Sequence, residues 1–239
     1  MKLPFVSCIM PTGNRQQFIP YAIDYFLHQD YRNSELIILD DGTTPSYPLV
    51  SDNPRIRYYY SKIPQLLGTK RNLCCQKARG DIIVHLDDDD WYAEDWISTA
   101  VDQLITSEAE VTGLNNVNFF LTDLNKKWKY RDGEDLYPWV YGGTLAYWKY
   151  FWALHPFKKM VAGEDNDFIW SSNAKIHQHH YTSGYLGLIH QENAGILPFQ
   201  NPRDKAQQLD GVTPAMVSSI YDLDILQRIT KLRSGNKEF

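Results

Sequence analysis

The chain has 239 residues, 43% hydrophobic and 22% charged, which is compatible with one globular domain with a sizeable core. Its formal net charge of −5 excludes bulk nucleic-acid binding, which needs a basic face. No apolar run approaches the ~20 residues of a transmembrane span, and the N-terminus lacks the apolar stretch of a signal peptide. We therefore expect a cytoplasmic protein, with peripheral contact to a membrane left open.

The first half alternates strands and helices. Short apolar runs predict strands, and helical spacing after Pro20, after Gly68 and from Ala93 predicts helices. Short connections between alternating strands and helices indicate a mostly parallel sheet with right-handed crossovers, flanked by helices. The strands are expected at Phe5–Met10, Leu36–Leu39, Arg55–Tyr60, Ile82–Leu86 and Val111–Phe120.

The second half is less regular. Lys126–Arg131 is typical of an exposed strand, Gly163 is expected to begin a helix that runs to Ser172, and Leu186–His190 is expected to be a late strand. Thr213 and Pro214 form a good N-cap and first turn for a C-terminal helix, whose apolar stripe is most simply core. The cysteines Cys8, Cys74 and Cys75 form neither a metal motif nor a disulfide framework, which indicates reduced intracellular thiols.

Four carboxylates, Asp87–Asp90, directly follow the predicted strand Ile82–Leu86. Ligands of open α/β sheets bind outside the carboxyl ends of the strands. In an extended chain, alternate side chains point the same way, so we expect Asp87 and Asp89 to converge. Oxygen ligands of this kind suit Mg²⁺ or Mn²⁺. The alternative is a solvated acidic turn.

Asp40 and Asp41 end another predicted strand of the same sheet, so we expect them on the same rim as the acidic run. A carboxylate there can accept a hydrogen bond from a nucleobase N–H or a ribose hydroxyl. The alternative is a turn acid that bonds to the backbone before Gly42. Lys70 and Arg71 lie near a helix start, which favours anions; the alternative for them, and for Arg15, is a solvated surface.

The motifs, taken together, resemble glycosyltransferase family 2 over roughly residues 4–195. They occur in the order seen in that family: Pro11-Thr12-Gly13-Asn14-Arg15, Asp40-Asp41-Gly42, Gly68…Lys70-Arg71-Asn72, Leu86–Asp90 and Gly163-Glu164-Asp165. The resemblance implies an α/β fold of the GT-A type and the use of nucleotide-diphosphate sugars. We expect one GT-A-like catalytic domain over 1–239, with a nucleotide-binding half (1–118), an acceptor half (119–200) and a C-terminal helical extension (201–239).

The resemblance also implies roles for the rim residues. Asp87 and Asp89 match the Asp-x-Asp motif that holds Mn²⁺ or Mg²⁺ against the donor diphosphate, and a dication stabilises the charge that develops on that leaving group. Asp40 and Asp41 match the pair that reads nucleobase and ribose. The further residues implied to bind the nucleotide or donor are Pro11, Thr12, Asn14, Arg15, Lys70, Arg71, Asp88, Gly142 and Gly143.

Asp165 matches the catalytic base of inverting family members, which takes the proton of an acceptor hydroxyl, and Glu164 would orient the acceptor or the base. The alternative is that both acids only complement the helix dipole. His190 matches a frequent third metal ligand, although an isolated histidine is more often an ordinary core or surface residue. His177, His179 and His180 lack ligand spacing and are interpreted as strand or loop residues.

An aromatic-glycine segment, Trp139–Thr144, is expected to line the donor or acceptor pocket, because aromatic faces stack on sugars and glycine lets backbone approach a ligand. The alternative is a core aromatic beside a tight turn. One departure from the family concerns Gly13, which stands where many relatives carry an aromatic residue able to stack on the base. The resemblance favours UDP as the carrier, but the missing ring weakens that inference and leaves TDP, GDP or another carrier open.

The motifs and the resemblance together thus predict a metal-dependent glycosyltransferase that moves a sugar from a UDP-sugar or a similar donor to an acceptor hydroxyl, and the resemblance alone implies inversion. The acceptor class, whether glycan, lipid, peptide or small molecule, is left open. One alternative is a sugar-nucleotide pyrophosphorylase or nucleotidyltransferase, which would need a glycine-rich basic loop where Pro11–Arg15 stands. Another is a non-catalytic sugar- or nucleotide-binding module, against which Asp87, Asp89 and Asp165 argue.

Overall fold

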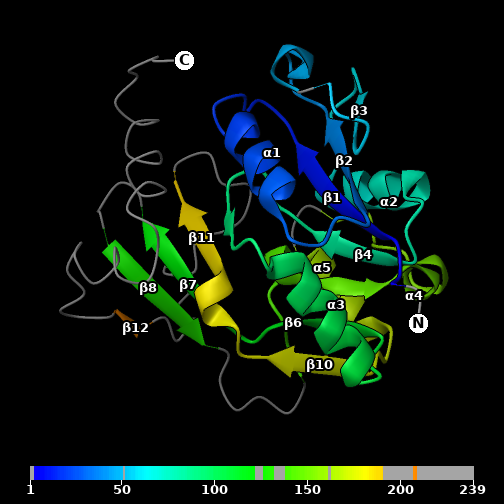
Figure 1. Cartoon of the computed structure of the whole chain (residues 1–239), viewed down its shortest axis with the longest axis vertical. Coiled ribbons are helices and arrows are strands. Elements are labelled where there is room, and N and C mark those ends of the chain that lie inside the picture. The colour runs from blue at the N-terminus through cyan, green and yellow to red at the C-terminus, as the bar shows by residue number, and fades with distance from the viewer. Residues whose placement is uncertain are drawn as a thin grey trace.

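The computed structural model describes residues 3–50, 52–121, 126–131, 138–160, 163–190 and 207–208. Within these residues the centre is a seven-stranded sheet of order β10-β6-β9-β4-β1-β2-β3 (Figure 1). Only β9 runs antiparallel to its neighbours, β4 and β6, so the mostly parallel sheet is confirmed. The strands are β1 (Val6–Thr12), β2 (Ser34–Asp40), β3 (Ile56–Tyr60), β4 (Ile82–His85), β6 (Val111–Leu114), β9 (Ala146–Trp148) and β10 (Ile176–His179).

Helices cover both faces of this sheet (Figure 1). One face packs against α1 (Ile19–His28) and α3 (Trp96–Thr106), the other against α2 (Leu67–Lys77), α4 (Lys149–Leu154) and α5 (Glu164–Ser171). Successive strand residues enter opposite layers: Cys8 of β1 packs on the first face and Ile9 on the second. Burial on both faces explains why these strands are continuous apolar runs rather than alternating ones.

A second sheet lies beside the first, with the order β12-β8-β7-β11-β5 in the described residues (Figure 1). Its strand β7 runs parallel to β11, and β11 runs antiparallel to β5. Lys126–Arg131 forms the predicted strand as β8, and the late strand is confirmed as β11. The strands are β5 (Trp91–Tyr92), β7 (Asn116–Leu121), β8 (Lys126–Arg131), β11 (Tyr185–Ile189) and β12 (Gln207–Gln208).

The prediction of one strand over Val111–Phe120 is wrong, because the segment contributes β6 to the main sheet and β7 to the second. At the break, the backbone N–H and C=O groups of Leu114 both bond to the aromatic-glycine segment instead of to a strand. The Leu114 carbonyl accepts from the Tyr141 N–H at 2.8 Å, and its N–H donates to the Thr144 hydroxyl at 3.0 Å. The chain can therefore leave the sheet without unpaired backbone groups.

Other expectations concern the ends of elements and the C-terminus. The helix predicted at Gly163 begins with Gly163 as a left-handed N-cap and runs to Ser171. The helix predicted from Thr213 lies outside the described residues. Cys8, Cys74 and Cys75 are free and buried, and the latter two pack from α2 as predicted. Among the described residues no helix is both long and apolar enough to cross a bilayer.

Helix α5 carries a sharp contrast between its inner and outer faces, which gives a stability test. Phe168 is 2% exposed and packs on Phe157, with ring centroids 4.3 Å apart, whereas Trp170 is 53% exposed. Phe168→Ala should destabilise the protein by about 3–5 kcal/mol in urea unfolding, through lost burial and a cavity. Trp170→Ala should change stability by no more than about 0.5 kcal/mol. Similar losses for both variants would contradict this packing.

Candidate active site

The predicted shared rim is confirmed. Strands β1, β2 and β4 are parallel neighbours, so the ends of all three lie at one edge of the sheet. Side chains then connect those ends. The Thr12 hydroxyl donates to Asp88 at 2.5 Å, and the Lys70 ammonium donates to the Thr12 carbonyl at 3.1 Å and to Asp41 at 2.9 Å. The termini of the three strands therefore form one connected polar surface.

Asp40 is fully buried and both of its oxygens are used by the protein. One accepts the Gly42 N–H at 2.8 Å, and the other accepts the Ser46 N–H at 2.8 Å and the Tyr58 hydroxyl at 2.7 Å. Burial alone would raise the pKa of Asp40, but these hydrogen bonds outweigh it and lower the pKa below its usual value. Asp40 is therefore an ionised acid that shapes the turn after β2, and nucleotide contact by it stays a prediction.

Asp41 is likewise bound within the protein. Its carboxylate accepts from Lys70 and, at 2.8 Å, from the backbone N–H of Gln65. A Cβ atom at Gly13 would lie 2.4 Å from the Asp41 carboxylate, which explains why this position is a glycine. An aromatic side chain there would have to displace Asp41 from Lys70. Asn14, next in the chain, has φ 58° and accepts the Thr43 N–H at 2.7 Å, so its role in the structure is to join two loops.

The acidic run is a turn and not an extended strand, so the expected alternation of its side chains is wrong. The neighbours Asp88 and Asp89 meet on one atom, Nη1 of Arg15, at 2.8 Å each. The Arg15 side chain is 15% exposed, so it is not the solvated surface residue of the alternative interpretation. The bound aspartates raise the pKa of Arg15 against the opposing effect of burial.

Asp90 points in another direction and fastens the second sheet. It accepts the Tyr185 hydroxyl at 2.5 Å and the Leu188 N–H at 2.9 Å, both from β11. His190 follows this strand and places its Nε2 atom 3.0 Å from the Asp89 carboxylate, with its ring 4.7 Å from that of Phe18. His190 therefore lies beside the acidic run, at the end of the strand that Asp90 holds, and its role as a metal ligand stays a prediction.

Asp87 is the remaining acid of the run, and its carboxylate lies beside Gly143. Its backbone N–H donates to the Tyr92 hydroxyl at 2.8 Å, and that hydroxyl donates to the Gly143 carbonyl at 2.9 Å. Burial raises the pKa of Asp87 to about 6, with Arg71 opposing the shift and Asp89 adding to it. A cationic partner would favour the ionised form of this carboxylate.

The two glycines of the aromatic-glycine segment separate Asp165 from Asp87. A Cβ on Gly142 would lie 2.1 Å from the Asp165 Oδ2 atom, and one on Gly143 would lie 2.9 Å from Asp87 Oδ2. Because consecutive Cα atoms are ~3.8 Å apart, the two carboxylates are within about 12 Å of each other. The predicted loop contains a short 3₁₀ turn, Gly142–Thr144, and contact of Gly142 and Gly143 with a ligand stays a prediction.

A buried hydrogen-bond chain holds Gly142 in place. His85 lies 2.7 Å from the Gly142 carbonyl through Nδ1 and 3.1 Å from the Tyr147 hydroxyl through Nε2. Because a carbonyl only accepts, Nδ1 carries the proton, and Tyr147 donates to Nε2. Burial, together with the charge of Arg71, lowers the pKa of His85 well below its usual value, which keeps the ring neutral.

Arg71 and Glu164 form an ion pair beneath the site, 2.5 Å apart and each 3% exposed. The solvated-face alternative for Arg71 is therefore wrong. Burial raises the pKa of Glu164, and Arg71 opposes that shift. Asp87 and Asp165 also act on the charge of Arg71. Glu164 thus positions the guanidinium, while Asp165 at the helix start has one oxygen bound by the Asn166 N–H at 2.8 Å.

The chemistry of Asp89 and His190 is compatible with a divalent cation whose remaining ligands come from a bound diphosphate. Among the described residues no three His, Cys, Asp or Glu side chains gather into a metal site of their own, and ligation by Asp87, Asp89 and His190 stays a prediction. Asp89 and His190 are 3.0 Å apart, which is close to the spacing of adjacent ligands around an octahedral ion with ~2.1 Å bonds. Mg²⁺ commonly takes one or two carboxylates and completes its shell with substrate phosphates.

Several structural contributors to the site were not identified from the sequence. His85 had a signal, since it is a polar residue within an otherwise apolar strand. Tyr92 also had one, because it follows the acidic run at the short strand β5. Tyr185 had none, because nothing in its surroundings in the sequence points to Asp90, 95 residues away. His177, His179 and His180, interpreted as strand or loop residues, lie on β10 and just after it, as predicted.

The comparison with protein families identifies the class. Residues 7–173 match the model of "Glycosyl transferase family 2", so the chain belongs to this family. It is 37% identical over 111 residues to the putative colanic acid biosynthesis glycosyl transferase WcaA of Escherichia coli, covering 43% of this chain and 40% of WcaA. It is 30% identical over 117 residues to an uncharacterized glycosyltransferase of Haemophilus influenzae, covering 47% of each. The chain thus spans less than half the length of these relatives.

Solved structures share the fold. Staphylococcus aureus TarS 1–349 in complex with UDP-GlcNAc superposes with a TM-score of 0.65 at 15% identity, over 81% of this chain and 62% of that one. The mannosyltransferase PcManGT of Pyrobaculum calidifontis, in complex with GDP-Man and Mn²⁺, gives 0.62 at 16% identity, over 99% of this chain and 72% of that one. The GT-A fold predicted from the sequence is confirmed.

The Arg71–Glu164 pair yields a pH-dependent prediction. Arg71→Met leaves Glu164 buried without its cation, which should cost about 3–5 kcal/mol at pH 7.5. The variant's Glu164 then has a folded-state pKa raised still further above its unfolded value. Stability is therefore retained at low pH, where the acid is protonated in both states, and lost as pH rises. Urea unfolding at pH 5 and pH 7.5 should show the smaller loss at pH 5.

The matched control is the double variant Arg71→Met/Glu164→Gln, which removes the stranded carboxylate. It should recover part of the stability at pH 7.5, because no buried charge remains unpaired at this position. A double variant less stable than Arg71→Met, or a loss that is the same at both pH values, would contradict the assigned ion pair.

Proposed function

We propose that this chain transfers a sugar from a nucleotide-diphosphate donor to an acceptor hydroxyl, with inversion and with the help of a divalent cation. The observation that carries the proposal is the pair Gly142–Gly143, which has Asp165 against one residue and Asp87 against the other. The proposed general base, Asp165, and Asp87, a carboxylate that could interact with a cation, therefore lie against the same short stretch of backbone. An inverting transfer needs such groups on opposite sides of the reacting carbon.

The donor nucleotide would bind along the rim formed by the ends of β1, β2 and β4. Family membership supports this placement, as does the rule that ligands of α/β sheets bind at the carboxyl ends of strands. UDP is the favoured carrier, and the solved relatives bind UDP-GlcNAc in one case and GDP-Man in another. Because Asp41 occupies the space beside Gly13, the base would have to stack elsewhere than on residue 13.

A divalent cation would be held by Asp89 and His190, with Asp87 nearby and the diphosphate completing its shell. When bound, it would neutralise negative charge on the departing diphosphate. Arg15, already bonded to Asp88 and Asp89, would add positive charge at the same place. The raised pKa of Asp87 fits a site built to accept a cation, because an isolated ionised carboxylate is disfavoured there.

Asp165 would act as the general base. Its Oδ1 accepts the Asn166 N–H, and its Oδ2 lies against Gly142, where a Cβ atom would clash with the carboxylate. The acceptor O–H would give its proton to Asp165 while its oxygen forms a bond to the anomeric carbon. The bond from that carbon to the diphosphate oxygen breaks, and the electron pair leaves with the diphosphate. Attack opposite the leaving group inverts the configuration.

The acceptor would be an oligosaccharide or a glycoconjugate. A curated relative from Campylobacter jejuni, 32% identical over 120 residues, which is 46% of this chain and 38% of that protein, is named GalNAc(5)-diNAcBac-PP-undecaprenol beta-1,3-glucosyltransferase. That name describes transfer to a saccharide already built. The relative's name supports only the saccharide class of the acceptor proposed for this chain.

The test replaces the proposed base. Asp165→Asn should reduce the release of nucleoside diphosphate from UDP- and GDP-sugars, with water or a saccharide mixture as acceptor, by about 10²–10⁴-fold. Affinity for the nucleoside diphosphate, measured by calorimetry, should stay unchanged, because the base does not contact the nucleotide. Asp102→Asn, an exposed acid on α3, is the control and should retain full activity. Undiminished turnover by Asp165→Asn would remove Asp165 as the base.

A further inference from the structure

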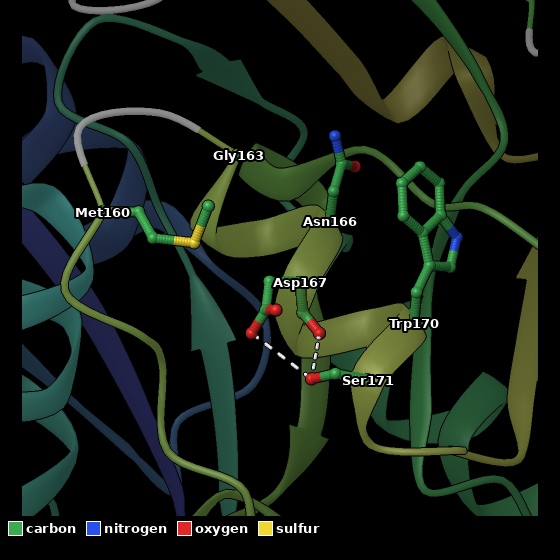
Figure 2. Close-up of a pocket in the computed structure, with 6 residues that line it drawn as sticks. All are labelled: Met160, Gly163, Asn166, Asp167, Trp170 and Ser171. Atoms are coloured by element: carbon green, nitrogen blue, oxygen red, sulfur yellow. Dashed lines mark hydrogen bonds between the residues drawn. The ribbon is translucent and has the colours of Figure 1, made fainter.

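An open cavity of about 420 Å³ lies on the outer face of α5, the helix that begins with Glu164 and Asp165. Its lining consists of the residues Met160, Gly163, Asn166, Asp167, Trp170 and Ser171. The last five recur at the spacing of one helix face. Figure 2 shows Met160 and Trp170 on opposite sides, with Asp167 and Ser171 between them. The volume falls in the range of small-molecule sites.

Trp170 is the dominant feature of this cavity. It is 53% exposed, although a tryptophan on a core-facing surface would be buried. Its ring is not loose, because the indole N–H donates to the Pro138 carbonyl at 3.3 Å. A fixed, exposed indole presents a flat apolar face to solvent. Such a face suits the C–H surface of a sugar ring, since aromatic side chains combine large apolar area with a polar edge.

Polar side chains line the same cavity as the indole. The Asp167 carboxylate accepts from Lys158 at 2.6 Å and retains lone pairs for hydroxyl donors. The Ser171 hydroxyl donates to the Asp167 backbone carbonyl at 2.6 Å and lies 3.3 Å from its carboxylate (Figure 2). The amide oxygen of Asn166 is occupied by the Trp139 indole N–H at 2.8 Å. Its amide nitrogen contributes two further donors. An aromatic platform with a carboxylate, an amide and a hydroxyl is the chemistry that binds a neutral saccharide.

The cavity is connected to the proposed base through adjoining residues. Asn166 directly follows Asp165, and Trp170 lies five positions after Asp165, which is about 7.5 Å along the helix and about 140° around it. Trp139, bound to Asn166, has its ring 6.3 Å from that of Tyr141, the residue before Gly142. Tyr141, Trp139 and Asn166 thus lead from the glycine pair at the site to α5. A saccharide that contacts both places would have to be several sugars long and follow this side of the helix.

We propose that the Trp170 cavity is a subsite for the acceptor saccharide, binding sugars beyond the one whose hydroxyl reacts. The inference rests on the proposed function for the identity of the ligand as an acceptor, and on the cavity itself for saccharide binding. Trp170 would stack on a sugar ring, and Asp167 with Asn166 would hydrogen-bond its hydroxyls. Longer acceptors would therefore bind more tightly than monosaccharides.

The experiment measures binding without turnover. Saturation-transfer NMR and titration with maltotetraose, cellotetraose, chitotetraose and mannotetraose, each without donor, should show at least one tetrasaccharide binding to the wild type. Trp170→Ala should weaken that binding roughly tenfold. Trp170→Phe should retain most of it, because a ring remains. Tyr150→Ala is the control, since Tyr150 is 55% exposed on α4, away from the cavity, and should bind like wild type.

Three results would overturn the subsite: no tetrasaccharide binding to the wild type, equal binding by wild type and Trp170→Ala, or loss of binding in Tyr150→Ala as well. Self-association that disappears in Trp170→Ala would instead assign the face to a second copy of the chain. The proposed function fails separately, if no nucleotide-sugar is turned over. Release of nucleoside diphosphate to water should be the same in Trp170→Ala and wild type, so a defect confined to long acceptors identifies the subsite.

Discussion

The burial of three consecutive carboxylates, Asp88–Asp90, just after β4 is the constraint on which the rest of the site depends. Charged groups removed from water need partners, and these three acids find them on other parts of the chain. Asp88 binds Thr12 of β1, Asp88 and Asp89 share Arg15, and Asp90 holds Tyr185 of the second sheet. The acids therefore join the two sheets, and this joining brings His190 beside Asp89.

The opposite wall of the site is organised by a second set of buried polar contacts. Glu164 holds Arg71 beneath the site, while the neutral ring of His85 holds the Gly142 carbonyl. Gly142 in turn leaves room for the Asp165 carboxylate. Because each of these groups is fixed by a partner from another element, the geometry is established before any ligand binds. Preorganised groups of this kind avoid reorganisation during a reaction.

Local patterns were sufficient for the parallel core of the sheet and for the start of α5, because continuous apolar runs and a glycine N-cap are signals within a few residues. Local patterns failed where residues far apart in the sequence determine the structure through pairing or side-chain contacts. Strand β9 has three residues, too few to show a period, and it is defined by pairing with β4 and β6. Asp40 matches a nucleotide-binding motif, yet Ser46 and Tyr58 occupy its carboxylate, which the motif does not reveal.

The central claim is a nucleotide-diphosphate site at the rim that includes Asp89. Its most direct test is thermal unfolding with UDP, GDP and TDP, each with Mn²⁺, with Mg²⁺ and with chelator. Ligand at a hundred times its dissociation constant adds ~2.7 kcal/mol, which corresponds to a rise in Tm of about 5–10 °C for a domain of this size. The account predicts such a rise for one nucleotide, dependent on metal and absent in Asp89→Ala. No rise with any nucleotide under any metal condition would contradict it.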